Sequence, residues 1–162
     1  IETDIINGKI SIRDETLKDE LEIHKPFYYE NLLNKSLHLD NKMSFNPCYM
    51  IRRNILNNTR FMEGMTHAED VLFFITLCSR DLNFGYIPDT TYHYRLTSIS
   101  AMSNMEGWRN GYFDLLNNLS HIPSISYSNT IIMRMKIAKM LASWHIKNKN
   151  ISGITDIFKI FL

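Results

Sequence analysis

The sequence predicts an α/β chain that is mostly helical, with a few short strands and a helical C-terminal extension. Two observations lead to this class. Up to about residue 103, short runs of β-branched and aromatic residues alternate with segments of helical periodicity. Beyond Ser103, segments of helical periodicity follow one another without a strand pattern between them. We therefore expect an α/β part at 1–103 and a helical extension at 104–162.

The α/β part begins with short strands. Residues 4–6 and 9–13 alternate around an Asn-Gly pair, which predicts a hairpin. Residues 14–25 are charged and polar, so we expect a loop or a short helix there. A helix is expected within 27–39, and an extended segment that turns into a helix is expected within 46–58.

The next helix is expected to be buried. It starts at Thr66 and runs to about Asp81, and its residues 71–75 are apolar around the whole helix. Residues 83–96 are aromatic and β-branched, which predicts one or two strands. Further helices are expected at 105–120, 127–148 and 152–162.

Composition places the chain among soluble globular proteins, because 44% of its 162 residues are apolar and 22% are charged. The formal net charge is +1, so charge alone favours neither a nucleic acid nor a membrane as partner. Cys48 and Cys78 are isolated, which is typical of a reducing compartment; a disulfide between them is the alternative. No cluster of cysteine and histidine has the spacing of metal ligands.

The stretch "MTHAEDVLFF" places two carboxylates, Glu69 and Asp70, at the entrance to the apolar helix. Thr66 and Glu69 fit a capping box, in which each side chain would accept a hydrogen bond from the other residue's backbone N–H. Asp70 is not part of this box, although an acid in the first turn of a helix also suits the helix dipole. A partly desolvated carboxylate at the edge of a core is the type of group that acts as a general base.

Two stretches, "RFMEGMTHAEDVLFFITL" and "IPDTTYHYRLTSIS", resemble the acceptor half of family 2 glycosyltransferases with the GT-A fold. The resemblance covers roughly residues 27–103, and the pairing of the two elements is more specific than either one. The matching residues are Arg60, Phe61, Glu63, Gly64, Glu69, Asp70, Val71, Phe73, Ile87, Pro88, Tyr92, Tyr94, Arg95, Ser98 and Ser100.

The resemblance implies a Rossmann-like GT-A domain and an inverting sugar transfer. A nucleotide-diphosphate sugar is the donor, and a saccharide, in some members lipid-linked, is the acceptor. By this resemblance Asp70 deprotonates the acceptor hydroxyl, and Glu69 orients Asp70 or contacts the acceptor. The parent would be a bacterial hexosyltransferase of surface polysaccharide synthesis, cytoplasmic or peripheral at the inner face of the cell membrane.

The chain departs from the family in its metal motif. The D-x-D motif that holds Mg or Mn is absent, and the nearest pattern, Glu2 to Asp4, is expected to belong to the strand after that motif. The donor-binding half should precede Ile1, so we expect a C-terminal half that has no metal of its own and is inactive alone; a processed whole domain is the alternative. Cys48 stands near the place where the family often has a lysine.

Three further residues are candidates for substrate binding. Alternation along a strand puts His93 and Arg95 on one face. By resemblance, Arg95 would lie near the donor diphosphate or the catalytic loop, with a surface ion pair as the alternative. His93 is a candidate metal or phosphate ligand or a structural histidine. His67, next to the carboxylates, is a candidate acceptor contact.

The predicted helix at 127–148 is two-faced. Lys136, Lys139 and Lys147 share one face. Apolar residues share another, namely Met133, Ile137, Met140, Leu141 and Trp144. The lysines are either solvated or in contact with an anionic membrane surface.

Two other classes of function stay open. The chain could be a non-catalytic helical binding or interaction module, with the carboxylate pair as a helix cap only. A half-domain would instead expose a sheet edge and self-associate, so a stable monomer favours the module. Nucleic-acid binding is not expected, because the net charge is near neutral and no nucleic-acid-binding motif occurs.

Overall fold

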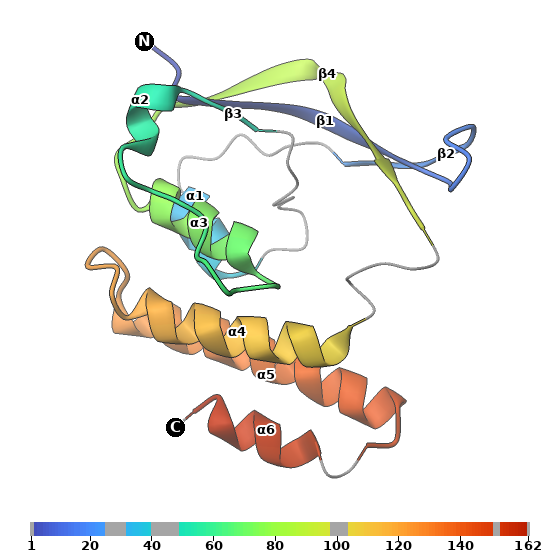
Figure 1. Ribbon diagram of the computed structural model, residues 1–162, viewed down its shortest axis with the longest axis vertical. Helices are drawn as coiled ribbons and strands as arrows, with labels where there is room; N and C mark the ends of the chain where they lie inside the picture. The colour runs from blue at the N-terminus through green and yellow to red at the C-terminus, as the bar shows by residue number, and fades with distance from the viewer. Residues whose placement is uncertain (1, 25–31, 40–48, 98–103, 151–152, 162) are drawn as a thin grey trace.

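The computed structural model describes residues 2–24, 32–39, 49–97, 104–150 and 153–161. An open sheet lies at one end of the molecule and the C-terminal helices lie at the other, with two further helices between them (Figure 1). The mixed α/β class predicted from the sequence is confirmed. Cys48 and parts of the helices predicted within 27–39, 46–58 and 152–162 lie outside the described residues.

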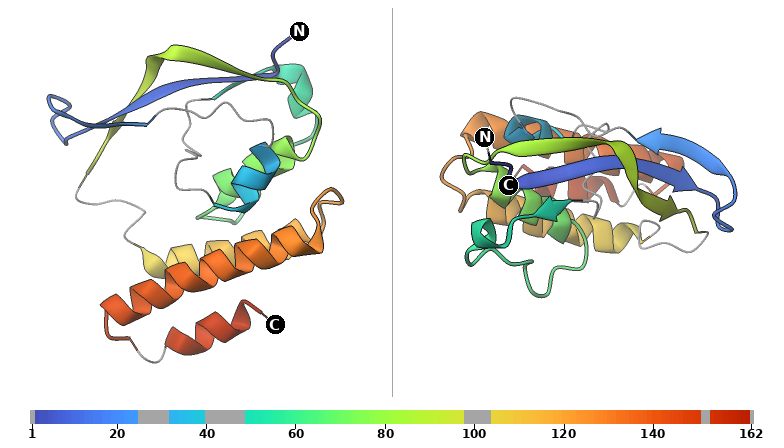
Figure 2. Two further views of the ribbon diagram at one scale, coloured as in Figure 1. Left: turned by 180° about the vertical axis from the view of Figure 1, so that it is seen from behind. Right: turned by 90° about the horizontal axis from the view of Figure 1, so that it is seen from above.

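The sheet is built around one central strand, β1 (Ile5–Arg13). The strand β4 (Phe84–Arg95) pairs with it in parallel from Ile5 to Arg13. Because β4 occupies one edge of β1 along its whole length, β2 (Glu20–His24) and β3 (Met50–Ile51) share the other edge, both antiparallel. Figure 2 shows this sheet as a layer over the helices.

The predicted hairpin at 4–6 and 9–13 is wrong, because one continuous strand runs through the Asn-Gly pair. The pairing with β4 continues past Gly8, so no turn forms there. Gly8 is buried, and a Cβ atom at this position would lie 2.3 Å from a methyl carbon of Thr91. The glycine is thus required for close approach of the neighbouring strand.

The loop or short helix predicted at 14–25 is also wrong in its second half, where β2 forms. Tertiary pairing stabilises this charged strand. The Ser11 hydroxyl donates to the Glu20 carboxylate at 2.6 Å, and an Arg13 guanidinium nitrogen lies 3.8 Å from the same carboxylate. A strand with four exposed residues carries little periodic signal of its own.

Three helices lie close to the sheet: α1 (Leu32–Leu37), α2 (Arg53–Leu56) and α3 (Glu69–Cys78). The helix α3 is buried as predicted, and it lies between the sheet and the C-terminal helices (Figures 1 and 2). On its sheet side, Phe74 contacts the rings of Tyr49 and Phe84. Cys78 is a free, buried thiol, and burial raises its pKa to about 12.

The predicted C-terminal helices are confirmed as α4 (Met105–Leu119), α5 (Tyr127–Lys147) and α6 (Ile154–Lys159). Side chains of Asn104 and Ser126 cap the first two of them. Every fourth residue of α5 from Met133 to His145 is buried, which gives the predicted core face. Met140, which the helix pattern assigned to that face, is 36% exposed.

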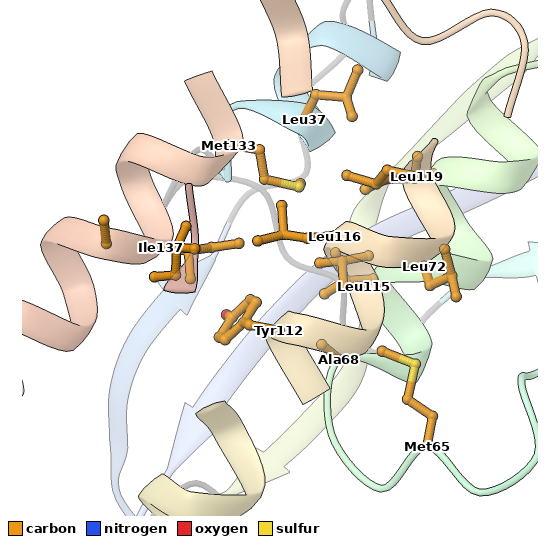
Figure 3. Close-up of a cluster of buried hydrophobic side chains, with 14 of the residues drawn as sticks. Leu37, Met65, Ala68, Leu72, Tyr112, Leu115, Leu116, Leu119, Met133 and Ile137 are labelled. Carbon is orange, nitrogen blue, oxygen red and sulfur yellow. The ribbon is translucent and has the colours of Figure 1, made fainter. Parts of the chain in front are cut away.

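The main hydrophobic cluster joins α1, α3, α4 and α5 (Figure 3). It therefore draws side chains from both sides of residue 103. Its members include Leu37, Met65, Ala68, Leu72, Tyr112, Leu115, Leu116, Leu119, Met133 and Ile137. This packing holds the start of α3 against α4.

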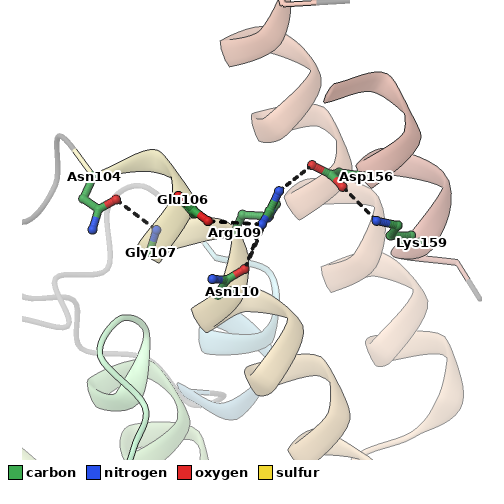
Figure 4. Close-up of polar contacts among 7 residues, drawn as sticks. All are labelled: Asn104, Glu106, Gly107, Arg109, Asn110, Asp156 and Lys159. Carbon is green, nitrogen blue, oxygen red and sulfur yellow. Dashed lines mark hydrogen bonds and ion pairs between the residues drawn. The ribbon is translucent and has the colours of Figure 1, made fainter. Parts of the chain in front are cut away.

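An ion pair between Arg109 and Asp156 attaches α6 to α4. Asp156 is 7% exposed and accepts a hydrogen bond from Arg109 at 3.0 Å, while Lys159 lies 3.3 Å from its other oxygen (Figure 4). Burial alone would raise the pKa of Asp156, but the bonds from these two cations outweigh burial and lower it. Among the described helices, none combines the length and apolarity needed to cross a membrane.

Candidate functional site

The two carboxylates of interest stand in the first turn of α3. This helix begins at Glu69, three residues later than predicted, and its N-cap residue is Ala68. No side chain caps the helix, so the predicted capping box of Thr66 and Glu69 is wrong. The Thr66 hydroxyl lies instead 3.1 Å from the Nδ1 atom of His67.

Ala68 adopts a left-handed backbone conformation, with φ of 60°. This conformation is uncommon for a residue with a Cβ atom and costs about 1–2 kcal/mol. The methyl group of Ala68 is buried in the main cluster beside Met65. Packing thus holds the strained residue immediately before the carboxylate pair.

The helix α4 provides the surface against which this turn packs. His67 is half-buried, and its ring lies 6.3 Å from that of Trp108. A Cβ atom added to Gly107 would lie 2.2 Å from the His67 ring, and one added to Gly111 would lie 2.2 Å from the His67 carbonyl oxygen. The two glycines therefore allow the backbone before α3 to approach α4 closely.

Asp70 lies at the surface of the molecule, yet protein atoms crowd its carboxyl group. One carboxylate oxygen accepts a hydrogen bond from the backbone N–H of Val71 at 2.8 Å. Burial raises the pKa of Asp70, and the neighbouring charge of Glu69 adds to this rise against the effect of the Val71 bond. A raised pKa makes the carboxylate a stronger base, which favours its acceptance of a proton from a hydroxyl group at this accessible position.

Tyr112 of α4 is a site neighbour that the sequence did not reveal. It is 5% exposed, and both burial and the charge of Asp70 raise the pKa of its phenol. The phenol therefore stays protonated at neutral pH beside the carboxylate. Only its place in a helix pattern was visible from the sequence, because the effect of the Asp70 charge on this phenol depends on how α3 and α4 pack.

His93 and Arg95 lie on β4, in a different layer from Asp70. Both are exposed while the alternate residues Tyr92 and Tyr94 are half-buried, as strand alternation predicted. The Nδ1 atom of His93 accepts a hydrogen bond from Nε of Arg13 at 3.2 Å.

Within the described ranges, no hydrogen bond or ion pair joins His93 or Arg95 to the carboxylates of α3. His67 alone of the three candidates for substrate binding is brought to the carboxylates, where it packs on α4. Ser98 and Ser100, which belong to the same sequence element as Arg95, lie outside the described residues.

The acidic residues nearest to a metal motif do not fit a metal site. Glu2 and Asp4 both lie against the Arg52 guanidinium, and the other oxygen of Asp4 accepts from the backbone N–H of Asn83 at 3.0 Å. No group of three or more histidine, cysteine, aspartate or glutamate side chains in the described part of the chain could hold a metal ion.

The structure thus holds two neighbouring carboxylates in the first turn of a buried helix, and the pKa of one of them, Asp70, is raised. Comparison with known proteins adds no assignment, since no model of a protein family matches the chain. A search of curated proteins likewise finds no match.

Proposed function

We propose that this chain is the acceptor-side part of a bacterial inverting glycosyltransferase of the GT-A type, and that Asp70 is its general base. One observation carries the proposal. The carboxyl group of Asp70, whose pKa is raised, lies at an accessible position on a helix turn that packing against α4 holds in place. A base on a rigid, packed element keeps the geometry that proton transfer requires.

In the proposed reaction Asp70 removes the proton of an acceptor hydroxyl. The hydroxyl oxygen then attacks the anomeric carbon of the donor sugar, and the bond from that carbon to the nucleoside diphosphate breaks with inversion. The proton stays on Asp70, and the leaving group carries away the electron pair of the broken bond. Glu69 is half-buried beside Asp70, where its charge favours the protonated form of the neighbouring carboxyl group.

Arg95 and His93 are proposed to contact the donor side of the substrate complex. Both side chains are exposed on β4, and Arg95 can bind phosphate oxygens with two parallel hydrogen bonds. The metal proposed for the full-length parent, Mg or Mn, would be held by residues outside this chain.

The proposed location is the cytoplasm or the inner face of the cell membrane. Lys136, Lys139 and Lys147 are all exposed on α5, as the helix pattern predicted. Apolar side chains accompany them on this surface, since Met135 is 59% and Ile146 is 76% exposed. Lysines beside exposed apolar groups are suited to an anionic bilayer surface, where the acceptor would be lipid-linked.

The test is sugar transfer by the full-length parent, comparing the wild type with the Asp70→Asn variant. A panel of UDP- and GDP-sugars is offered with lipid-linked or synthetic acceptors. General-base catalysis contributes about 10²–10⁴-fold, so kcat should fall by about that factor while the protein stays folded. Asp81→Asn is the matched control, because Asp81 is exposed just beyond the other end of the same helix. Near-normal turnover of Asp70→Asn would remove the assignment of the base.

A further inference from the structure

A pocket of about 280 Å³ lies between α2, the loop that follows it and α3. It contains no acidic lining residue. Its lining comprises Arg53, Leu56, Asn57, Thr59, Arg60, Phe61 and Phe73. Two cations and two aromatic rings therefore surround one small cavity.

The two lining arginines are not neutralised by acids. Arg53 and Arg60 are both exposed, and no carboxylate in the described residues forms an ion pair with either. The preceding residue differs, because the guanidinium of Arg52 lies against Glu2 and Asp4. The positive charge of these two lining arginines is therefore not engaged by any ion pair within the described residues, and it attracts an anion.

Hydrogen bonds hold the loop that follows α2 and carries Arg60 in place. Arg60 donates to the carbonyl oxygens of Asn57 at 3.2 Å and Thr59 at 2.8 Å. Arg80, which follows the end of α3, donates to the carbonyl oxygen of Ile55 at 2.6 Å and also to the Thr59 hydroxyl. These bonds preorganise the loop, so little ordering would be lost on binding.

An aromatic wall adjoins the cations. The rings of Phe61 and Phe73 stack, with centroids 4.4 Å apart and an interplanar angle of 14°. Phe61 is nevertheless 56% exposed, so a large apolar surface stays open beside the arginines. An apolar or aromatic group of a ligand could cover it.

The pocket also lies on the same side of α3 as the carboxylate pair. Phe73 is three residues after Asp70 and four after Glu69, and side chains at these spacings are neighbours about 5–6 Å apart on a helix. A ligand seated against Phe73 would therefore extend toward the proposed base.

We propose that this pocket binds a phosphoryl group that carries an apolar or aromatic moiety. Arginine forms paired hydrogen bonds to phosphate oxygens, and the stacked rings accept the attached group. The identification of the ligand as a substrate of sugar transfer rests on the proposed function. The existence of the anion site does not depend on that function. The two sources of this chemistry are the nucleoside diphosphate of a donor and the phosphate of a lipid-linked acceptor.

Isothermal titration calorimetry of the full chain with pyrophosphate, UDP and dodecyl phosphate below its micelle concentration tests the site. Arg53→Gln and Arg60→Gln should each weaken binding at least about tenfold. Arg60→Lys, which keeps the charge, should bind better than Arg60→Gln. Phe61→Ala should weaken the binding of UDP or of dodecyl phosphate and leave the affinity for pyrophosphate unchanged. Lys18→Gln, which loses one positive charge at an exposed position in the β1–β2 turn, should bind like the wild type.

The ligand arms identify the source. Tighter binding of UDP than of dodecyl phosphate assigns the site to the donor, and the reverse order assigns it to the acceptor. Absence of binding for all three probes overturns the proposal, as does an equal loss of affinity in Lys18→Gln. Retained binding of these probes by a parent that transfers no sugar would reject the proposed function and keep the anion site. Circular dichroism of each variant confirms that it is folded.

Discussion

The carbonyl oxygen of His67 and the α carbon of Gly111 are in such close contact that a Cβ atom on residue 111 would lie 2.2 Å from that oxygen. This contact joins the turn before the carboxylate pair to α4. The next residue, Ala68, has a left-handed backbone conformation and is the N-cap of α3. The position of Asp70 therefore depends on packing between two helices that are far apart in the sequence.

Gly111→Ala should destabilise the protein by about 1–3 kcal/mol, because the new methyl group meets a backbone carbonyl that cannot rotate away. This cost should exceed the gain in helix propensity, about 1 kcal/mol. The measurement is urea unfolding followed by circular dichroism. Sugar transfer by the parent should also fall, because the first turn of α3 is displaced.

Gly107→Ala is the matched comparison for that variant. A methyl group there meets side chains only, those of His67 and Asn104, which can change rotamer. It should cost less stability than Gly111→Ala. An equal or larger cost would contradict the role of the backbone contact.

Asp70→Asn should increase the free energy of unfolding at pH 7 slightly, by about 0.5 kcal/mol, since solvent screens the exposed carboxylate. The carboxyl group loses its proton near pH 4 in the unfolded chain and at a higher pH in the folded one. Between these values the folded state binds more protons, so stability falls as pH rises and stays lower above them. The gain of the variant should therefore disappear below the unfolded pKa. A gain that persists at pH 3 would contradict this account.

Asp156→Asn should destabilise the protein by about 1–2 kcal/mol at pH 7, because it weakens the charge-assisted bond from Arg109. The lowered pKa of Asp156 means that its contribution is present above the unfolded pKa and is lost as pH falls through the folded value. Thermal unfolding at several pH values measures both effects. Lys159→Gln should cost less than about 0.5 kcal/mol, since that side chain is 63% exposed.

Replacing Lys136, Lys139 and Lys147 with glutamine should weaken binding of the parent to anionic vesicles about a hundredfold. Each lysine near such a surface contributes about 1 kcal/mol. Vesicle sedimentation at increasing salt measures the effect, and Lys18→Gln in the β1–β2 turn is a control for a lysine elsewhere. Equal binding of the wild type to neutral vesicles would remove the membrane assignment.

Several parts of the fold could be predicted from local patterns. The run of apolar residues after Asp70 indicated that α3 is buried, and the spacing from Met133 to Leu141 indicated the core face of α5. Alternation along β4 separated exposed His93 from half-buried Tyr92. Each of these features follows from residues that are neighbours in the sequence.

The errors arose where distant segments override a local signal. An Asn-Gly pair favours a turn, but Thr91 of β4 packs against Gly8 and the strand continues. Thr66 and Glu69 have the spacing of a capping box, but the N-cap residue is Ala68, which is left-handed, and no side chain caps the helix.

The sequence by itself determined which segments are helices and which faces are apolar, because these depend on the periodicity of the side chains. It also placed the Glu69–Asp70 pair at the start of a buried helix. Only the tertiary structure decided that the charge of Asp70 acts on the phenol of Tyr112, and that Arg53 and Arg60 line one pocket with the stacked rings of Phe61 and Phe73. These relationships depend on which surfaces pack together when the chain folds, and the local sequence pattern does not specify contacts between distant segments.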